Sequence, residues 1–171
     1  MLPRPHLLMF PKARIFWPLA SLLVLADCTT KELAVDHFSP AQVPHDVIGS
    51  AVRFTLAYNA GSAFGVDWGP WSRAVLILIM IASLVVLTQL YRRAEPTRRI
   101  AAVALALVCG GAIGNLLDRV SSARGVVDFI DVGVGAHRFW TFNVADAGIT
   151  IGALLLAVLL SRSEWARTRE S

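Results

Sequence analysis

The stretch FNVADAGITIGALLLAVLL, residues 142–160, decides the fold class of this chain. Apart from Asn143 and Asp146 near its start it could dissolve in a lipid bilayer, and its length is close to the roughly 20 residues that cross a hydrocarbon core. A carboxyl group at the head of such a span is costly if it faces lipid, so it marks a candidate functional site. Asn and Asp are also common N-cap residues, and the stretch alone leaves both interpretations open.

Three further stretches of the same kind occur in the chain. Of its 171 residues 56% are hydrophobic and only 16% are charged, and the mean hydropathy is +0.60, which is a membrane composition. Apolar runs at 15–35, 74–90 and 100–117 join the run at 142–160. The sequence therefore predicts a mainly α integral membrane protein, a single membrane domain over residues 1–171 with four transmembrane helices.

The basic residues fall on one side of this four-span arrangement. Ten of the sixteen Lys and Arg residues lie before the first span, between the second and third spans, or after the fourth. By the positive-inside rule this side is the cytoplasm, so we expect both termini inside and segments 36–73 and 118–142 outside. The net charge of +4 is thus explained by topology, and no nucleic-acid partner is expected.

The first apolar segment could be mistaken for a cleaved lipoprotein signal that ends at LVLADC, residues 23–28. Asp27 stands where such a signal has a small residue, and three more spans follow, so we interpret the segment as a retained helix. Cys28 and Cys109 lie in apolar runs, where a free thiol behaves as a small hydrophobic group. The four histidines have no metal-ligand spacing, and neither a metal nor another cofactor is expected.

Two polar features precede the second span. Asp27 and Lys31 are four residues apart, so they can pair on one helix face, either as an anchor of the helix end or as part of a site. If they pair in an apolar setting, loss of Asp27 is expected to leave Lys31 unpaired. The segment AVRFTLAY, residues 51–58, alternates as a short strand does, and we expect a small extracytoplasmic β-rich element at the membrane surface.

This element leads into NAGSAFG, residues 59–65. Asn59, Gly61 and Gly65 suit a tight backbone path close to a ligand, although an ordinary turn uses the same residues. The pattern is weak evidence by itself.

The third span ends in CGGAIGNLLDRV, residues 109–120. Gly110 and Gly114 follow the small-xxx-small pattern that lets helices approach closely. Gly111, Asn115 and Arg119 follow a four-residue spacing and therefore share a helix face. The amide of Asn115 and the guanidinium of Arg119 could bind a carboxylate or a peptide group at the outer end of the bundle.

Two carboxyl groups flank the last loop. Asp128 lies in an apolar, strand-like context, and Asp146 opens the fourth span eighteen residues later. If the loop doubles back, the two groups meet in a poorly hydrated place where one of them is protonated more easily than usual. A pair of one protonated and one ionised carboxyl can activate water and polarise an amide carbonyl. No GxSxG motif offers a serine alternative.

Five motifs of the chain together resemble bacterial lipoprotein signal peptidase, also called signal peptidase II. They are DCTTK, NAGSAFG, GGAIGNLLDR, GVVDFID and FNVAD, in this order, and the likeness extends over nearly the whole of 27–160. The resemblance implies an intramembrane aspartic endopeptidase of the bacterial inner membrane. Its implied substrates are prolipoproteins, cut just before a cysteine that already carries diacylglycerol, with the active site near the extracytoplasmic face.

The resemblance also assigns roles to residues of this chain. The implied catalytic pair is Asp128 and Asp146, and Asp27 with Lys31 matches the pair of the first span. The positions that would line or support the site are Asn59, Gly111, Asn115, Arg119, Asn143 and Ala145. Asp118 and Asp131 also fall within motifs but are expected to be structural. Cys28 replaces a Gln that is common in the family, at a position that is not catalytic.

Two other classes of protein remain as alternatives at this point. A channel or transporter needs polar groups at several depths, whereas the span 74–90 contains only Ser83, Thr88 and Gln89. A scaffold that packs partner helices through GGAIG would leave the two outer aspartates unexplained. The peptidase accounts for more of the sequence than either.

Overall fold

The computed structural model describes residues 12–60, 69–95 and 98–168, and its main elements are four helices. Each is long and apolar enough to cross a membrane. The predicted class, mainly α with four membrane helices and a small sheet, is confirmed. A short 3-10 turn, Gly69–Trp71, precedes the second helix. The helices are α1 (Ala13–His37), α2 (Ser72–Arg93), α3 (Arg99–Ser121) and α4 (Val144–Thr168).

Most helix ends differ from the predicted spans by one to four residues, and α4 extends eight residues past its predicted end. Three of the helices begin one or two residues before the predicted apolar runs, because polar residues at the ends continue the backbone pattern. Helix α4 instead begins two residues after the predicted start at 142. The reason is that Phe142 forms a β-bridge with Ile130 and is therefore extended.

Helix α3 packs between α1 and α4, and its small residues make this possible. A Cβ atom added at Gly110 would come within 2.9 Å of the carbonyl oxygen of Ala20 in α1. One added at Gly111 would collide with the carbonyl oxygen of Ala145 in α4. Glycines at these positions therefore let backbones touch on both sides of α3, as the sequence predicts for Gly110.

Basic side chains cap the C-terminal ends of two helices. Nζ of Lys12 donates to the carbonyls of Tyr91 at 2.8 Å and Ala94 at 2.7 Å, at the end of α2. Arg73, at the start of α2, donates from Nε to the carbonyl of Arg119 at 2.7 Å, near the end of α3. A cation near a helix C-terminus satisfies free carbonyls and opposes the negative end of the helix dipole. Helix α2 is thus fixed to a neighbour at each of its ends.

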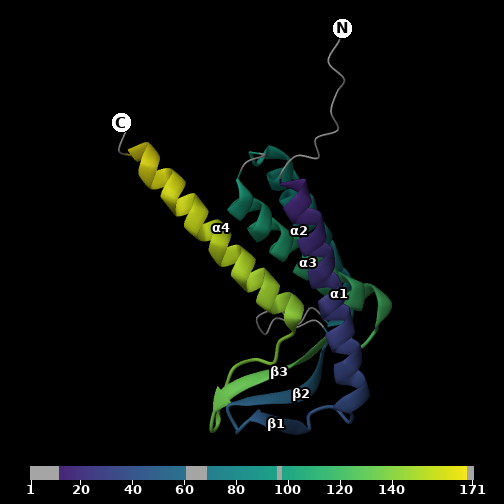
Figure 1. Cartoon of the computed structure of the whole chain (residues 1–171). Coiled ribbons are helices and arrows are strands. Elements are labelled where there is room, and N and C mark those ends of the chain that lie inside the picture. The colour runs from purple at the N-terminus through teal and green to yellow at the C-terminus, as the bar shows by residue number, and fades with distance from the viewer. Residues whose placement is uncertain (1–11, 61–68, 96–97, 169–171) are drawn as a thin grey trace.

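The sheet lies at one end of the helices, and the start of α1 and the end of α4 lie at the other (Figure 1). Its four antiparallel strands follow the order β1-β2-β3-β4. Their bounds are β1 (Pro44–Ile48), β2 (Val52–Asn59), β3 (Val126–Val134) and β4 (His137–Arg138). The strand predicted within 51–58 is confirmed as β2. Strand β3 pairs with it, so that the two loops between helices form one sheet.

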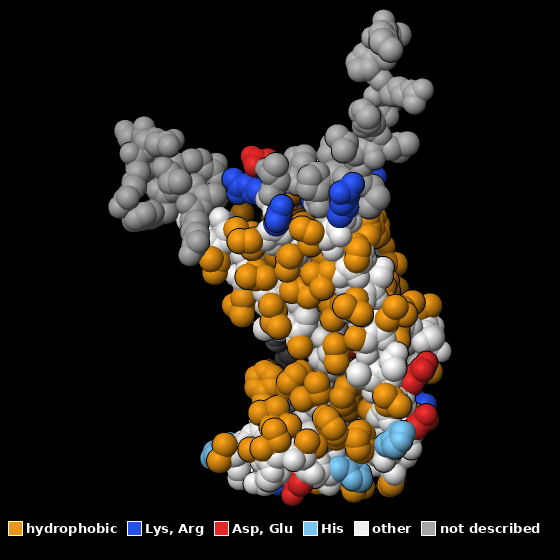
Figure 2. Space-filling model, in the orientation of Figure 1, with side chains coloured by type: hydrophobic (Ala, Val, Ile, Leu, Met, Phe, Trp, Pro, Cys, Tyr) orange, Lys and Arg blue, Asp and Glu red, His pale blue; other side chains and the backbone are white. Residues whose placement is uncertain are grey.

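The surface of the helices is apolar, and Lys and Arg side chains gather at the end away from the sheet (Figure 2). Leu25, Leu78 and Leu154 are each more than 60% exposed, which is unusual for large apolar side chains in water but fitting for side chains that face lipid. The exposed band therefore marks the part of the molecule that lies within the hydrocarbon core.

Candidate functional site

The polar start of α4 is a reciprocal helix cap. Oδ1 of Asn143 accepts a hydrogen bond from the backbone N–H of Asp146 at 2.8 Å, and Oδ2 of Asp146 accepts one from the backbone N–H of Asn143 at 3.3 Å. This is the pairing of N-cap and third helical residue that satisfies two free N–H groups at once. The cap interpretation is therefore correct, but it uses only Oδ2 of the Asp146 carboxyl. Oδ1 accepts a bond from Nδ2 of Asn115 at 2.7 Å, in α3.

The bridge at Phe142 brings Asp128 to the same place. The carbonyl of Phe142 accepts hydrogen bonds from the N–H of Phe129 at 3.0 Å and of Ile130 at 2.8 Å. The N–H of Phe142 donates to the carbonyl of Ile130 at 3.0 Å. Strand β3 turns back through β4 to make this pairing. The residue after Phe142 is therefore held beside Asp128, and Nδ2 of Asn143 donates to Oδ1 of Asp128 at 2.7 Å.

Asn143 thus contacts both carboxyl groups, with its side-chain amide at Asp128 and its backbone N–H at Asp146. Asn143 is 0% exposed, Asp128 is 6% exposed and Asp146 is partly exposed. Burial raises the pKa of Asp128 to about 7, and the negative charge of Asp146 adds to this rise. The hydrogen bond from Asn143 and the positive charges of Lys31 and Arg119 act in the opposite direction. The pair therefore contains a carboxyl that is largely protonated below neutral pH.

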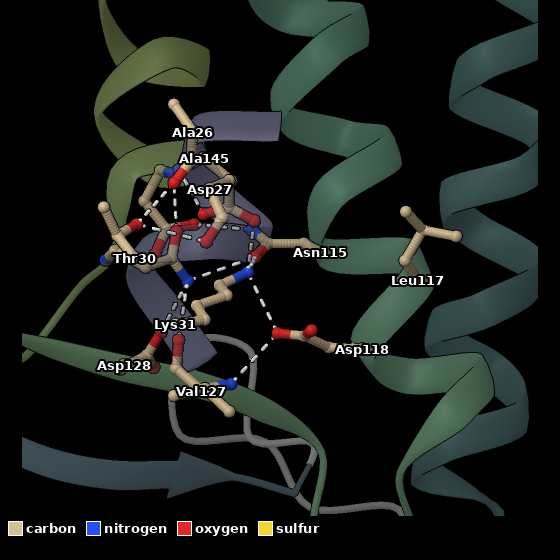
Figure 3. A network of polar contacts seen from close by, with 12 residues as sticks. Ala26, Asp27, Thr30, Lys31, Asn115, Leu117, Asp118, Val127, Asp128 and Ala145 are labelled. Atoms are coloured by element: carbon tan, nitrogen blue, oxygen red, sulfur yellow. Dashed lines mark hydrogen bonds and ion pairs between the residues drawn. The ribbon is translucent and has the colours of Figure 1, made fainter. Parts of the chain in front are cut away.

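Behind the pair, Lys31 is the centre of a buried ionic network (Figure 3). Its Nζ lies 2.6 Å from Oδ2 of Asp27 and 2.9 Å from Oδ2 of Asp118, and it donates to Oδ1 of Asn115 at 3.0 Å. An ammonium group has three protons, and each has one of these acceptors. The Lys31 side chain is 3% exposed and that of Asp27 is 0% exposed, so water contributes little to their solvation.

The network joins the elements that carry the two carboxyls. Oδ1 of Asp27 accepts from the backbone N–H of Ala145 at 2.8 Å, next to Asp146 in α4. Oδ2 of Asp118 accepts from the backbone N–H of Val127 at 3.1 Å, next to Asp128 in β3. Lys31 therefore connects α1 with the residue before each member of the pair. A shift of the ion pairs would move both carboxyl groups.

Asp118 is the residue whose importance the sequence analysis missed. It is expected from the sequence to be structural, and the structure shows that it shares Lys31 with Asp27. The available signal was its spacing, since it lies three residues after Asn115 and hence on the same helix face. The expectation that removal of Asp27 leaves Lys31 unpaired is wrong for the same reason, because Asp118 remains as a partner.

The other predicted site residues have different positions relative to the pair. Gly111 and the fully buried Ala145 form the close contact of α3 with α4 beneath the pair. Arg119 is 9% exposed, and its guanidinium interacts electrostatically with both carboxyls. Asn59 ends β2 opposite Val126, two residues before Asp128. Gly61 and Gly65 lie outside the described residues.

Asp131, on the same strand as Asp128, belongs to a separate cluster. Its Oδ1 accepts from Nε of Arg138 at 2.8 Å, and its Oδ2 accepts from the hydroxyl of Thr55 at 3.2 Å. These contacts join three strands of the sheet. The two aspartates of GVVDFID thus have different environments, one against the helices and one within the sheet.

Four apolar helices with buried acid, amide and ammonium groups gathered at one end define a class of protein: an integral membrane protein with a buried polar cluster, which is the usual mark of a candidate functional site within a membrane. The sequence identifies the family more closely. The signal peptidase (SPase) II family matches residues 19–162, and the chain belongs to this family. It is therefore a membrane-embedded peptidase that removes signal peptides from prolipoproteins, and the resemblance of its motifs is confirmed.

Individual relatives agree with this assignment. The lipoprotein signal peptidase of Ectopseudomonas mendocina is 43% identical over 152 residues, which cover 86% of this chain and 89% of that protein. That of Geobacillus kaustophilus is 38% identical over 145 residues, which cover 84% and 90%. A bacterial membrane enzyme solved by the in meso method at 2.3 Å resolution has a similar fold, with a TM-score of 0.76, 30% identity and coverage of 86% and 87%.

Proposed function

We propose that the chain cleaves diacylglyceryl-modified prolipoproteins immediately before the lipid-modified cysteine, with Asp128 and Asp146 as the catalytic pair. The observation that carries this proposal is that Asn143 donates to both carboxyl groups, from its side-chain Nδ2 to Asp128 and from its backbone N–H to Asp146, and so holds them together at the end of the bundle. A peptide whose signal segment spans the membrane would present its scissile bond at the same depth. The paired carboxyls require no cofactor for this reaction.

The environments of the two carboxyl groups suggest a different catalytic role for each. Asp128, with its raised pKa, is the protonated member and donates a hydrogen bond to the scissile carbonyl. Asp146, which accepts hydrogen bonds on both oxygens, is the carboxylate that takes a proton from the attacking water. The water oxygen bonds to the carbonyl carbon, the C–N bond then breaks, and the proton held by Asp146 passes to the leaving nitrogen.

The remaining site residues position this pair or line the place where the substrate binds. Asn115 and Asn143 orient the carboxyls by the bonds described above, and Arg119 offsets their negative charge. Asp27 and Lys31 hold the neighbouring backbone from behind. We propose that Asn59, Gly111 and Ala145 shape the site, because they lie at the strand end and at the helix contact next to the pair.

The pH dependence of cleavage tests the proposed roles. Asp128 must be protonated to act as the acid, and it loses its proton as the pH rises through about 7. We therefore expect the rate to fall by about tenfold for each pH unit well above that value. The measurement is cleavage of a purified diacylated prolipoprotein by the purified enzyme in detergent. A rate that stays constant up to about pH 9 would contradict the assignment of the acid, and rapid cleavage of the unmodified precursor would contradict the proposed substrate.

We further propose that the protein is one domain in the bacterial cytoplasmic membrane, with both termini in the cytoplasm and the pair near the extracytoplasmic face. The support is the position of the Lys and Arg clusters at the end away from the sheet (Figure 2). Reporter fusions after Ser171 and near residue 70 should therefore report opposite compartments. The same compartment for both positions would exclude this topology.

A further inference from the structure

A cavity of about 310 Å³ opens between α2, α3 and α4 at the basic end of the molecule. Its walls are mostly leucine side chains of three helices, among them Leu90, Leu105 and Leu156. Arg93, Glu95 and Arg98 also line it, at the end of α2 and just before α3. The cavity thus combines apolar walls with two guanidinium groups.

The cavity is separate from the proposed active site. Leu105 lies ten residues before Asn115 on α3, a distance of roughly 15 Å along the helix axis. Strand β3 and the start of α4, which carry the carboxyl pair, lie at the opposite end of the bundle (Figure 1). None of the residues that hold Asp128 or Asp146 lines the cavity. A ligand bound here would therefore not be the peptide segment that the enzyme cleaves.

The charges at the cavity favour an anion. Arg98 pairs with Glu95 at 3.3 Å, but both side chains are more than half exposed, so this ion pair is weak and a stronger anion can replace it. The cavity then offers two guanidinium groups, which bind phosphate well through paired N–H donors. The basic start of a signal peptide would be repelled by the same two arginines, which argues against the substrate as occupant.

We propose that this cavity binds one anionic phospholipid, with its phosphate at Arg93 and Arg98 and its acyl chains along the leucine walls. Basic pockets between membrane helices on the cytoplasmic side bind such headgroups, and Figure 2 shows basic side chains directly beside the apolar band at this end. The ligand class follows from the combination: a free phosphate would leave the apolar walls empty, and an uncharged lipid would not use the arginines. This inference is independent of the proposed catalytic roles.

Two double variants with the same change in charge provide the test. Arg93→Gln with Arg98→Gln alters the cavity, whereas Arg92→Gln with Arg99→Gln alters neighbouring exposed residues that do not line it. Native mass spectrometry of the purified protein would measure binding of phosphatidylglycerol and of phosphatidylcholine with the same acyl chains. We expect the first lipid to bind at least about tenfold more tightly to the wild type, and this preference to be lost in the cavity variant only.

Three results would overturn the proposal. Equal binding of the two lipids would indicate ordinary boundary lipid, and equal losses in the two double variants would indicate a diffuse charge effect. Stabilisation by inorganic phosphate alone, to the same melting temperature as with phosphatidylglycerol, would indicate a site for a free anion. If the cavity variant does not fold, Ala101→Leu provides a second test, because it fills the cavity and keeps both arginines. It should lower phosphatidylglycerol binding, and unchanged binding would also refute the site.

Discussion

Asp128→Asn and Asp146→Asn are each expected to lower cleavage of a diacylated prolipoprotein by about a thousandfold or more while the protein stays folded in the membrane. Asparagine keeps the size and one oxygen of each side chain, so Asn143 retains an acceptor at both positions. What is lost is the group that can exchange a proton. The measurement is the single-turnover rate of each purified variant, with the melting temperature as the check on folding.

The matched control for these variants is Asp131→Asn. It removes a carboxyl from the same strand, but one that bonds Arg138 and Thr55 and does not contact the pair. Activity should remain within a few-fold of the wild type. Because Asp128 and Asp146 are proposed to act in one step, the double Asn variant should be scarcely slower than either single variant. Substantial turnover by either single variant, or a requirement for a divalent metal ion, would exclude the carboxyl pair as the catalyst.

Lys31→Met should cause the largest loss of stability in the network. It removes the only cation within bonding distance of Asp27 in the described part of the chain and leaves that carboxyl and Asp118 close to one another. Removing one partner of a buried ion pair typically costs about 3–5 kcal/mol. We expect a large fall in melting temperature of the detergent-purified protein, together with loss of activity, since Lys31 holds the backbone beside both members of the proposed catalytic pair.

Asp27→Asn should be milder than Lys31→Met, although it alters the same ion pair. Lys31 keeps Asp118 and Asn115 as partners, and the new amide oxygen can still accept from the N–H of Ala145. Combining the two substitutions should restore part of the stability lost in Lys31→Met, because one uncompensated carboxylate is removed. If Asp27→Asn were the more damaging of the two, Asp118 would not be the second partner of Lys31 that the distances indicate.

The membrane helices could be predicted from the sequence because their signal is local. Runs of about 20 apolar residues need no knowledge of the partner segments, and the same holds for the cap formed by Asn143 and Asp146. The pattern of four-residue spacing in α3 also placed Asn115 and Arg119 on one face. Each of these features depends only on residues that are close together in the sequence.

The parts that could not be predicted depend on contacts between distant segments. The bridge of Phe142 with Ile130 decides that Asp128 meets Asn143, and nothing in the loop composition specifies this pairing. The cap that Lys12 provides for α2 joins residues about eighty positions apart, so no local pattern indicates it. The role of Asp118 is similar, since it depends on where the side chain of Lys31 ends.

Helix α3 has one further consequence, which concerns the thickness of the membrane. Arg99 stands at its start and Asn115, which bonds the proposed base, is sixteen residues later, so the two are separated by roughly 24 Å along the axis. With Arg99 at one headgroup layer of a hydrocarbon core about 30 Å thick, Asn115 lies just beneath the opposite layer. The length of this helix therefore sets the depth of the proposed catalytic carboxyls in the membrane. A bilayer of shorter lipids would bring them toward water and one of longer lipids would bury them further, which makes acyl-chain length a determinant of activity alongside pH.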